Sequence, residues 1–265
     1  MCLILFAYQH HSHYPLVLAA NRDERFDRPT RAAQFWPEDP NLLAGKDLEA
    51  GGTWMGITRG GRFAAVTNFR GHPTVTGVLS RGRLCSDFLQ SNSSSGAYAE
   101  QVIRQADQYA GFNLLVNDGN DFFYCNNHNN TITPLQPGIY GLSNGLLDVQ
   151  WPKINKGKQG LANILNHEHV TADNLLTLLR DEQTADDLAL PNTGVGLQRE
   201  RQLSPLFIRV QVIHTQAPGY GTCNSTALLI DRDNHVLFKE RSFYQPPIQS
   251  TPNDQQFSFS LQTSP

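Results

Sequence analysis

The second residue of the chain combines two chemical groups that could carry out one reaction together. Cys2 follows the initiator Met1, which is usually removed when the next residue is as small as cysteine. Removal leaves Cys2 with a thiol and a free α-amine, whose unperturbed pKa of roughly 7.7 to 8.0 suits a general base at neutral pH. Nucleophile and base then share one residue, as in enzymes that pair a threonine with its own amine. The alternative interpretation is a small buried cysteine that begins a strand.

Four polar residues that directly follow an apolar run form a second candidate cluster. The apolar run 16–20 ends at Asn21-Arg22-Asp23-Glu24. Alternation along a strand would direct the first and third of these side chains to one face of a sheet and the second and fourth to the other. If this strand and that of Cys2 form a hairpin, one of the two pairs could face a site near the thiol. The alternative is a solvated turn.

Strands in the first third of the chain and helices in the middle would position these residues. Apolar residues bounded by Gly, Pro or polar clusters predict strands at 2–8, 15–21, 54–58 and 62–69. Gly60-Gly61 joins the last two as a hairpin turn. Apolar residues at helical spacing predict helices at 81–90 and 97–110, with Ser80 and Ser95 as N-caps.

The second half of the chain again contains strands followed by helices and further strands. We expect strands at 112–117, 121–126 and 139–142, helices at 154–165 and 172–180, a loop at 186–201, and strands at 207–212, 225–231 and 236–242. Two groups of strands with helices inserted between them predict an α+β fold. We expect one domain over residues 1–245 and, because the last residues are rich in Gln, Ser and Pro, a disordered tail at 246–265.

The composition excludes several classes of protein. The 265 residues are 39% hydrophobic and 17% charged, with a net charge of −3, so there is no basic excess that would bind a nucleic acid. The apolar runs are far shorter than the roughly 20 residues that cross a bilayer, and no basic segment precedes the first run as in a signal peptide. We therefore expect a cytoplasmic protein with no transmembrane segment and four free thiols. No CxxC pair is present, and we expect no metal site.

Short motifs spread along the chain carry a family resemblance. They are, in order, Met1-Cys2, Asn21-Arg22-Asp23-Glu24, Gly51-Gly52-Thr53-Trp54-Met55-Gly56, Thr67-Asn68-Phe69-Arg70, Leu79-Ser80-Arg81-Gly82, Gly141-Leu142-Ser143-Asn144, Trp151-Pro152-Lys153 and Tyr220-Gly221-Thr222. Together they resemble the NRDE-motif family, also called the transport and Golgi organisation protein 2 family. The resemblance implies an N-terminal-nucleophile hydrolase fold, a four-layer αββα sandwich with two mainly antiparallel sheets. It also implies a distant similarity to choloylglycine hydrolases and penicillin V acylases.

The same resemblance implies which residues form an active site. Cys2 resembles the nucleophile that attacks an amide carbonyl, and Arg22 and Asp23 resemble the pair that orients it. Asn68 and Asn144 resemble the asparagines that stabilise the oxyanion. Such a site would cleave a linear nonpeptide C–N amide through a thioester on Cys2 and would require no cofactor. For the two asparagines, the alternative role is to satisfy backbone groups at a strand end.

The residue types fit this chemistry, and one position departs from the family. Asp23 can hold the amine or thiol of Cys2, and the charge of Arg22 is expected to depress the pKa of the thiol. An asparagine amide N–H can donate to an oxyanion. Cys223 stands where the family commonly has Arg after Tyr-Gly-Thr, so we carry over no carboxylate or phosphate contact of that Arg. Cys223 is either a plain substitution or a second reactive thiol.

A second class of function is carriage of a ligand in the same pocket. The resemblance implies either haem trafficking or binding of an acyl-CoA-like ligand, without turnover. His10, His11 and His13 lie in the loop of the first predicted hairpin, and imidazole is a common axial ligand of haem iron. The alternative is a solvated loop whose histidines change protonation with pH. The expected partners are therefore a small-molecule amide, haem or an acyl-CoA-like ligand, and the sequence leaves the substrate and the oligomeric state open.

Overall fold

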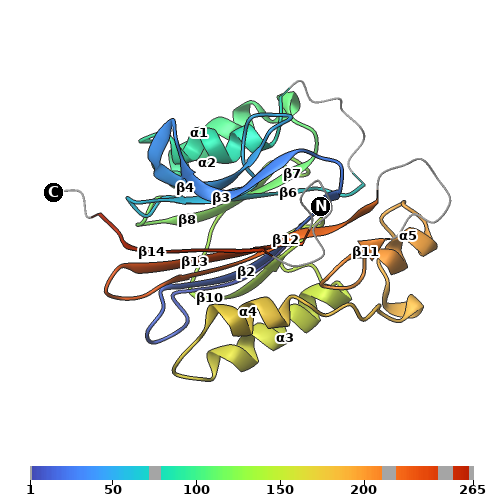
Figure 1. Ribbon diagram of the computed structural model, residues 1–265. Helices are drawn as coiled ribbons and strands as arrows, with labels where there is room; N and C mark the ends of the chain where they lie inside the picture. The colour runs from blue at the N-terminus through green and yellow to red at the C-terminus, as the bar shows by residue number, and fades with distance from the viewer. Residues whose placement is uncertain (1, 72–78, 211–218, 244–252, 263–265) are drawn as a thin grey trace. The chain divides into compact units, whose positions relative to one another are not determined.

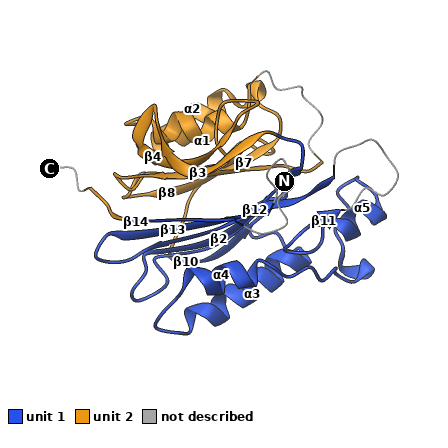
Figure 2. Cartoon of the chain, viewed as in Figure 1, with its two compact units in different colours: residues 1–28, 137–258 blue, residues 29–136, 259–265 orange. Residues whose placement is uncertain are grey.

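The chain divides into two compact units. The structure, a computed structural model, describes residues 2–71, 79–210, 219–243 and 253–262. One unit comprises residues 1–28 and 137–258, and the other comprises residues 29–136 and 259–265 (Figure 2). Each unit has its own sheet and its own helices, where the sequence predicted a single domain over 1–245.

The first unit is built on a seven-stranded sheet. Its strands follow the order β10-β1-β2-β12-β13-β14, and β11 also pairs with β12. Their bounds are Cys2–Tyr8 (β1), Leu16–Arg25 (β2), Gly138–Leu142 (β10), Arg209–Val210 (β11), Tyr220–Ile230 (β12), His235–Ser242 (β13) and Asn253–Ser260 (β14). The pairings from β10 across to β13 are all antiparallel, as the predicted fold class requires.

Two helices pack on one face of this sheet (Figure 1). They are α3 (Pro152–Leu165) and α4 (Ala172–Leu178). Strand alternation directs Leu3 and Leu5 to this face, where they are fully buried in one cluster with Ile154 of α3. The hydroxyl of Thr171 accepts a hydrogen bond from the Asn174 backbone N–H at 3.2 Å and so caps α4. The hydrophobic periodicity of both segments thus predicted these helices.

The segment predicted as a loop contains two short helices, η2 (Asp187–Ala189) and α5 (Leu197–Gln202). Gly194 and Gly196 lie between them with φ of 86° and 84°, values that glycine adopts without steric cost. Of the strand predicted at 207–212, only Arg209–Val210 form β11. Residues 207 and 208 precede this strand, and residues 211 and 212 lie outside the described residues.

The second unit contains another seven-stranded antiparallel sheet, in the order β3-β4-β5-β6-β7-β8-β9. The strands are Thr30–Trp36 (β3), Asp39–Asp47 (β4), Met55–Thr58 (β5), Phe63–Asn68 (β6), Phe112–Asn117 (β7), Phe122–Asn126 (β8) and Thr131–Pro134 (β9). Helices α1 (Gly82–Leu89) and α2 (Ser95–Arg104) pack on one face of the sheet (Figure 1). Phe88, Tyr98 and Phe112 are among the buried side chains between these helices and the sheet.

Three strands of the second unit were missing from the sequence prediction, namely β3, β4 and β9. The β3–β4 ladder has two register shifts, which interrupt the period-two pattern that identifies a strand. Strand β9 lies at the sheet edge and buries no residue, so it has no apolar face to detect. The predicted helix 97–110 ends at Arg104 and is followed by a short 3₁₀ turn, η1 (Ala106–Gln108). Its N-cap is Ser94 instead of Ser95.

The prediction of a disordered tail was wrong for residues 253–260, which form β14. Gln255, Phe257 and Phe259 are half-buried, whereas the residues between them are exposed. This alternation is the normal signal of a strand. The high content of Gln and Ser concealed it, because composition alone favours disorder.

In the part of the chain that the structure describes, no helix is long and apolar enough to span a membrane.

The contact between α3 and β1 predicts opposite effects for two glycines of the same helix. A Cβ on Gly157 would lie 2.7 Å from two carbons of the fully buried Leu5, which has no room to move. A Cβ on Gly160 would meet only the end of the half-buried Leu178. We expect Gly157→Ala to lower the free energy of unfolding by about 1–3 kcal/mol, and Gly160→Ala to leave it unchanged or raise it by up to about 1 kcal/mol. Equal urea midpoints for the two variants would contradict this account of the packing.

Candidate functional site

The ladder between β1 and β2 places Cys2 directly opposite Arg22. Seven pairs join the two strands, from Cys2↔Arg22 through Leu3↔Asn21 to Tyr8↔Leu16. Directly opposed residues of an antiparallel pair project their side chains to the same face, with Cβ atoms about 4.5–5.5 Å apart. The predicted opening hairpin is therefore confirmed, and the Arg22 side chain lies beside the thiol. Because the two strands are antiparallel, the N-terminal end of β1 is next to the end of β2 at which Asp23 follows Arg22.

A bulge in β12 completes the other side of β2. Asn224 lies opposite Arg22 and Thr222 lies opposite Asp23, so Cys223 is the extra residue between the two pairs. This arrangement lets the Thr222 hydroxyl donate to Asp23 Oδ1 at 2.7 Å. The same hydroxyl accepts from the Ile208 backbone N–H at 2.9 Å.

The four polar residues at the end of β2 divide between the two faces of the sheet, as alternation predicted. Arg22 Nη2 lies 4.0 Å from Glu24 Oε2 on the Cys2 face. On the helix-covered face, Asn21 Nδ2 donates to the carbonyls of Leu206 at 2.8 Å and Leu179 at 3.0 Å. Its Oδ1 accepts from the Ser225 hydroxyl. Asn21 therefore connects β2 to its neighbouring segments and belongs to the scaffold.

Burial governs the ionisation of Asp23. The residue is only 1% exposed, and burial raises the pKa of its carboxyl above the ordinary value. The positive charge of Lys153, the hydrogen bond from Thr222 and the charge of Arg22 act in the opposite direction. Lys153 belongs to the motif Trp151-Pro152-Lys153, but nothing in the sequence connects it with Asp23.

Burial also raises the pKa of the Cys2 thiol. This effect outweighs the lowering by the charge of Arg22 and by a hydrogen bond from the Asp23 backbone, while the Asp23 charge raises the pKa further. Arg22 thus lowers the pKa of this thiol, as predicted, but the net pKa is still raised. The reason is that desolvation of the thiolate costs more than one neighbouring guanidinium returns. A protonated thiol at neutral pH needs a base before it can attack a carbonyl.

Asn144 lies close to Cys2 in the same unit. Strand β10 pairs with β1 up to Ile4↔Leu142, and the two residues after Leu142 continue along β1 toward Cys2. The Ser143 hydroxyl donates to the Cys2 carbonyl oxygen at 2.9 Å, which fixes this approach. Asn144 is fully buried, with its Oδ1 3.4 Å from the Ser143 hydroxyl.

Asn68 belongs to the second unit. It is the last residue of β6, pairs with Phe112 of β7 and is half-buried. The structure thus brings together Cys2, Arg22, Asp23 and Asn144 in the first unit. The assignment of Asn68 to the same site stays a prediction from the family resemblance.

Cys223 has the properties of a structural residue. Its Sγ donates to the backbone carbonyls of Glu24 and Gly221, both at 3.6 Å. Burial raises the pKa of this thiol to about 12. A thiol held in this way is a poor nucleophile at neutral pH, which favours the interpretation of Cys223 as a plain substitution.

The three histidines of the first hairpin loop differ in their surroundings. His11 is only 7% exposed, with Nδ1 accepting from the His13 backbone N–H at 3.1 Å and Nε2 3.2 Å from the His167 carbonyl. His10 and His13 are exposed, and His13 Nε2 lies 3.7 Å from a carboxylate oxygen of Glu168. Both nitrogens of His11 are thus engaged, one by the loop itself and the other by the segment that follows α3. Among the described residues, no group of three or more His, Cys, Asp or Glu could hold a metal ion.

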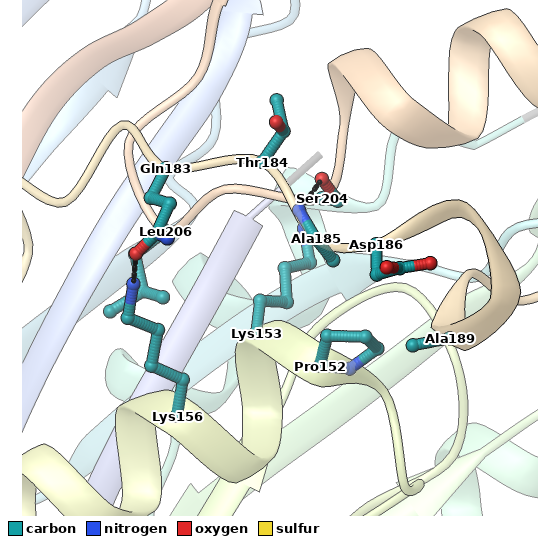
Figure 3. A pocket seen from close by; sticks show the side chains of 10 residues that line it. All are labelled: Pro152, Lys153, Lys156, Gln183, Thr184, Ala185, Asp186, Ala189, Ser204 and Leu206. Carbon is teal, nitrogen blue, oxygen red and sulfur yellow. Dashed lines mark hydrogen bonds between the residues drawn. The ribbon is translucent and has the colours of Figure 1, made fainter.

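A cavity of about 350 Å³ lies in the first unit where α3 begins (Figure 3). Its wall includes Lys153 and Lys156 of α3 and Asp186 and Ser204 from the following segments. Lys156 Nζ donates to Gln183 Oε1 at 2.8 Å, and the Ser204 hydroxyl accepts from a backbone N–H at 2.9 Å. Lys153 contributes its stem to the wall, and its ammonium donates to the Leu203 carbonyl oxygen at 3.0 Å.

Comparison with known proteins identifies the family. The sequence model of the family described as "Transport and Golgi organisation 2" matches residues 1–245. The chain belongs to this family. The Transport and Golgi organization protein 2 homologs of Bos taurus and Homo sapiens are 36% and 34% identical to the chain over 256 residues, covering 91% of the chain and 93% of each relative. The predicted family is thereby confirmed.

One solved structure shows the fold. The Caenorhabditis elegans ortholog of N-acylethanolamine-hydrolyzing acid amidase superposes with a TM-score of 0.51 at 10% identity, covering 86% of this chain and 92% of that protein. Identity at this level shows the fold alone. The chain therefore has the N-terminal-nucleophile hydrolase fold of the α+β class that the resemblance implied.

The contacts of Asn21 predict a large loss of stability when its side chain is truncated. Asn21→Ala removes the donor for two buried carbonyls and the acceptor for a buried hydroxyl. We expect the free energy of unfolding to fall by about 2–3 kcal/mol, because buried polar groups lose their partners. Urea denaturation measures this loss, with Asn120→Ala at an exposed turn as the control. Similar midpoints for the two variants would exclude a scaffold role for Asn21.

The environment of Cys223 predicts protection from alkylation. In the folded protein at neutral pH, iodoacetamide is expected to leave Cys223 unmodified, because a pKa of about 12 leaves only about one thiolate in 10⁵. The same residue should react fully in urea. Peptide mapping after timed labelling distinguishes the two states. Native labelling at the rate of an exposed cysteine would instead identify a second reactive thiol.

Proposed function

We propose that the protein is an amidohydrolase whose nucleophile is Cys2 after removal of Met1. The observation that carries this proposal is the arrangement at the start of β1. There the Cys2 thiol lies beside Arg22, the adjacent Ser143 and Asn144 approach from β10, and the buried Asp23 follows Arg22 along β2. The proposed substrate is a linear nonpeptide amide, and the reaction needs no cofactor.

In the first half of the proposed reaction, the amide is cleaved and the acyl group is transferred to sulfur. The free α-amine of Cys2 takes the thiol proton, and the thiolate forms a C–S bond to the carbonyl carbon. Asn144 donates an amide N–H to the oxyanion, with Asn68 as a predicted second donor. When the C=O bond reforms, the C–N bond breaks and the leaving amine takes the proton from the α-ammonium. The product is a thioester on Cys2.

In the second half, water releases the acid. The neutral α-amine takes a proton from water, and the resulting hydroxide oxygen bonds to the thioester carbon. The C–S bond then breaks, and the sulfur recovers the proton from the α-ammonium. The raised pKa of the Cys2 thiol supports this base-assisted route, since a thiol that is protonated at neutral pH depends on the amine for activation.

The similarity in fold indicates which substrates to test first. The Caenorhabditis elegans protein is named for hydrolysing N-acylethanolamines, which are linear nonpeptide amides. A screen should therefore begin with N-acyl amines of different chain lengths. We expect the reaction to take place in the cytoplasm, because the four cysteines are all free, as is usual in a reducing compartment.

The alternative function is a noncatalytic carrier for haem or an acyl-CoA-like ligand. Since both ring nitrogens of His11 are engaged by backbone groups of the chain, an axial ligand from this hairpin would be His10 or His13. A carrier would bind its ligand with Met1 retained and would tolerate substitution of Cys2. These properties separate it from the hydrolase.

The hydrolase proposal predicts a specific mass and a specific adduct. Intact-mass measurement of protein made without an N-terminal tag should show loss of Met1. A thiol-directed acylating probe should then add once, at Cys2. Cys2→Ala should abolish the adduct and lower turnover by more than about a thousandfold, Cys2→Ser should impair turnover, and Cys223→Ala should retain the adduct at Cys2. Retention of Met1 without preferential labelling of Cys2 would overturn the hydrolase proposal, and a haem titration would follow.

A further inference from the structure

A buried lysine in the first turn of α3 calls for an explanation. Lys153 is only 3% exposed, although a lysine is almost never fully buried unless its charge is compensated. Its ammonium donates to the Leu203 carbonyl oxygen at 3.0 Å, but one neutral carbonyl does not offset the cost of removing a full charge from water. In Figure 3 the side chain runs along the cavity wall from α3.

The buried carboxyl of Asp23 is influenced by the charge of Lys153. After the dominant effect of burial, which raises the pKa of this carboxyl, the positive charge of Lys153 is the largest influence that lowers it, ahead of Arg22. Arg22 is adjacent in sequence, but its side chain lies on the opposite face of β2 and interacts there with Glu24. Of the two positive side chains, Lys153 thus favours the ionised carboxylate more than Arg22 does.

One short segment joins the two charges. Leu203 accepts the hydrogen bond from Lys153, Leu206 accepts one from Asn21, and Ile208 donates to the Thr222 hydroxyl that binds Asp23. The segment 203–208 therefore holds the lysine and the surroundings of the carboxylate in one hydrogen-bonded arrangement. These hydrogen bonds connect the start of α3 with the end of β2.

We propose that Lys153 is a positioning residue for the reaction proposed above. Its buried ammonium keeps Asp23 ionised, and the ionised Asp23 accepts a hydrogen bond from the α-amine of Cys2 and so holds this base beside the thiol. The inference rests on the proposed function, because it assigns Lys153 a role in that same site. Lys153 acts through Asp23 and does not touch the substrate.

Several other charged or titratable groups surround Asp23 and contribute to any pH profile. Cys2 of β1, Arg22 of β2 and Tyr220 of β12 interact with Asp23 itself, and Glu24 of β2 and Arg199 of α5 interact with Tyr220. The Tyr220 hydroxyl donates to the Asp23 backbone carbonyl at 3.2 Å, and burial raises the pKa of this tyrosine well above its ordinary value. Tyr220 therefore stays neutral at the near-neutral pH of the proposed reaction. On the face of the sheet where Asp23 lies, substitution of Lys153 by a neutral residue removes a positive charge.

The test compares pH profiles of Cys2 labelling and of turnover. Lys153→Met keeps the length of the side chain and removes the charge, Lys153→Arg keeps the charge, and Lys156→Met removes a partly exposed lysine of the same helix that pairs with Asp181. We expect Lys153→Met to move the acid limb of both profiles upward by about one pH unit, which is a tenfold loss of rate at a fixed acidic pH. Lys153→Arg should recover most of this loss, and Lys156→Met should follow the wild-type profile.

Combining Lys153→Met with Asp23→Asn shows whether Lys153 acts through Asp23 or affects the site in some other way. If Lys153 acts through Asp23, Lys153→Met should cause little further shift of the labelling profile in the Asp23→Asn background. An unchanged profile in Lys153→Met, or an equal shift in both backgrounds, would overturn the inference while leaving the proposed hydrolase intact. Absence of Cys2 labelling in the wild-type protein would overturn the proposed function.

The pH dependence of stability tests the coupling without any turnover. Because the pKa of Asp23 is raised in the folded chain, that chain binds its proton more tightly than the unfolded chain, so the free energy of unfolding falls as pH rises through this ionisation. Lys153→Met should steepen this fall, and the double variant with Asp23→Asn should remove the additional slope. If Lys153→Met folds only at acidic pH, this supports the coupling, whereas parallel curves for wild type and variant would overturn it.

Discussion

The register between β1 and β2 is the constraint on which the candidate site depends. A slip of one residue would move every side chain of β1 to the opposite face, and Cys2 would no longer lie beside Arg22. Such a slip would also remove Leu3 and Leu5 from the core beneath α3 and α4. The hydrophobic face therefore fixes the position of Cys2 relative to Arg22.

The bulge at Cys223 sets the register between β2 and the next strand, β12. One extra residue in β12 allows Thr222 to bind Asp23 on one face, while Asn224 remains opposite Arg22. The thiol of Cys223 is turned to backbone carbonyls. The β-bulge at Cys223 thus brings the Thr222 hydroxyl into hydrogen-bonding distance of Asp23.

Burial is the dominant electrostatic effect at the site. It raises the pKa of both Cys2 and Asp23 even though positive charges lie near each of them. Buried charges of this kind add little stability compared with apolar residues of similar size. Their presence is consistent with a site that holds a protonated thiol beside a base instead of a preformed thiolate.

The sequence alone determined the N-terminal cysteine, the alternation at the end of β2, most of the strands and helices, and the family from which the fold followed. These features depend on local periodicity and on motifs that the chain carries directly. The tertiary structure alone decided strands β3, β4 and β9, the role of Asn21 in the scaffold, the direction of the Cys2 pKa shift and the link between Lys153 and Asp23. Strand β14 has a local alternation that its Gln- and Ser-rich composition concealed. Burial and charge compensation depend on residues that are distant in sequence and meet only after the strands have paired and the helices have packed, so no local pattern could reveal them.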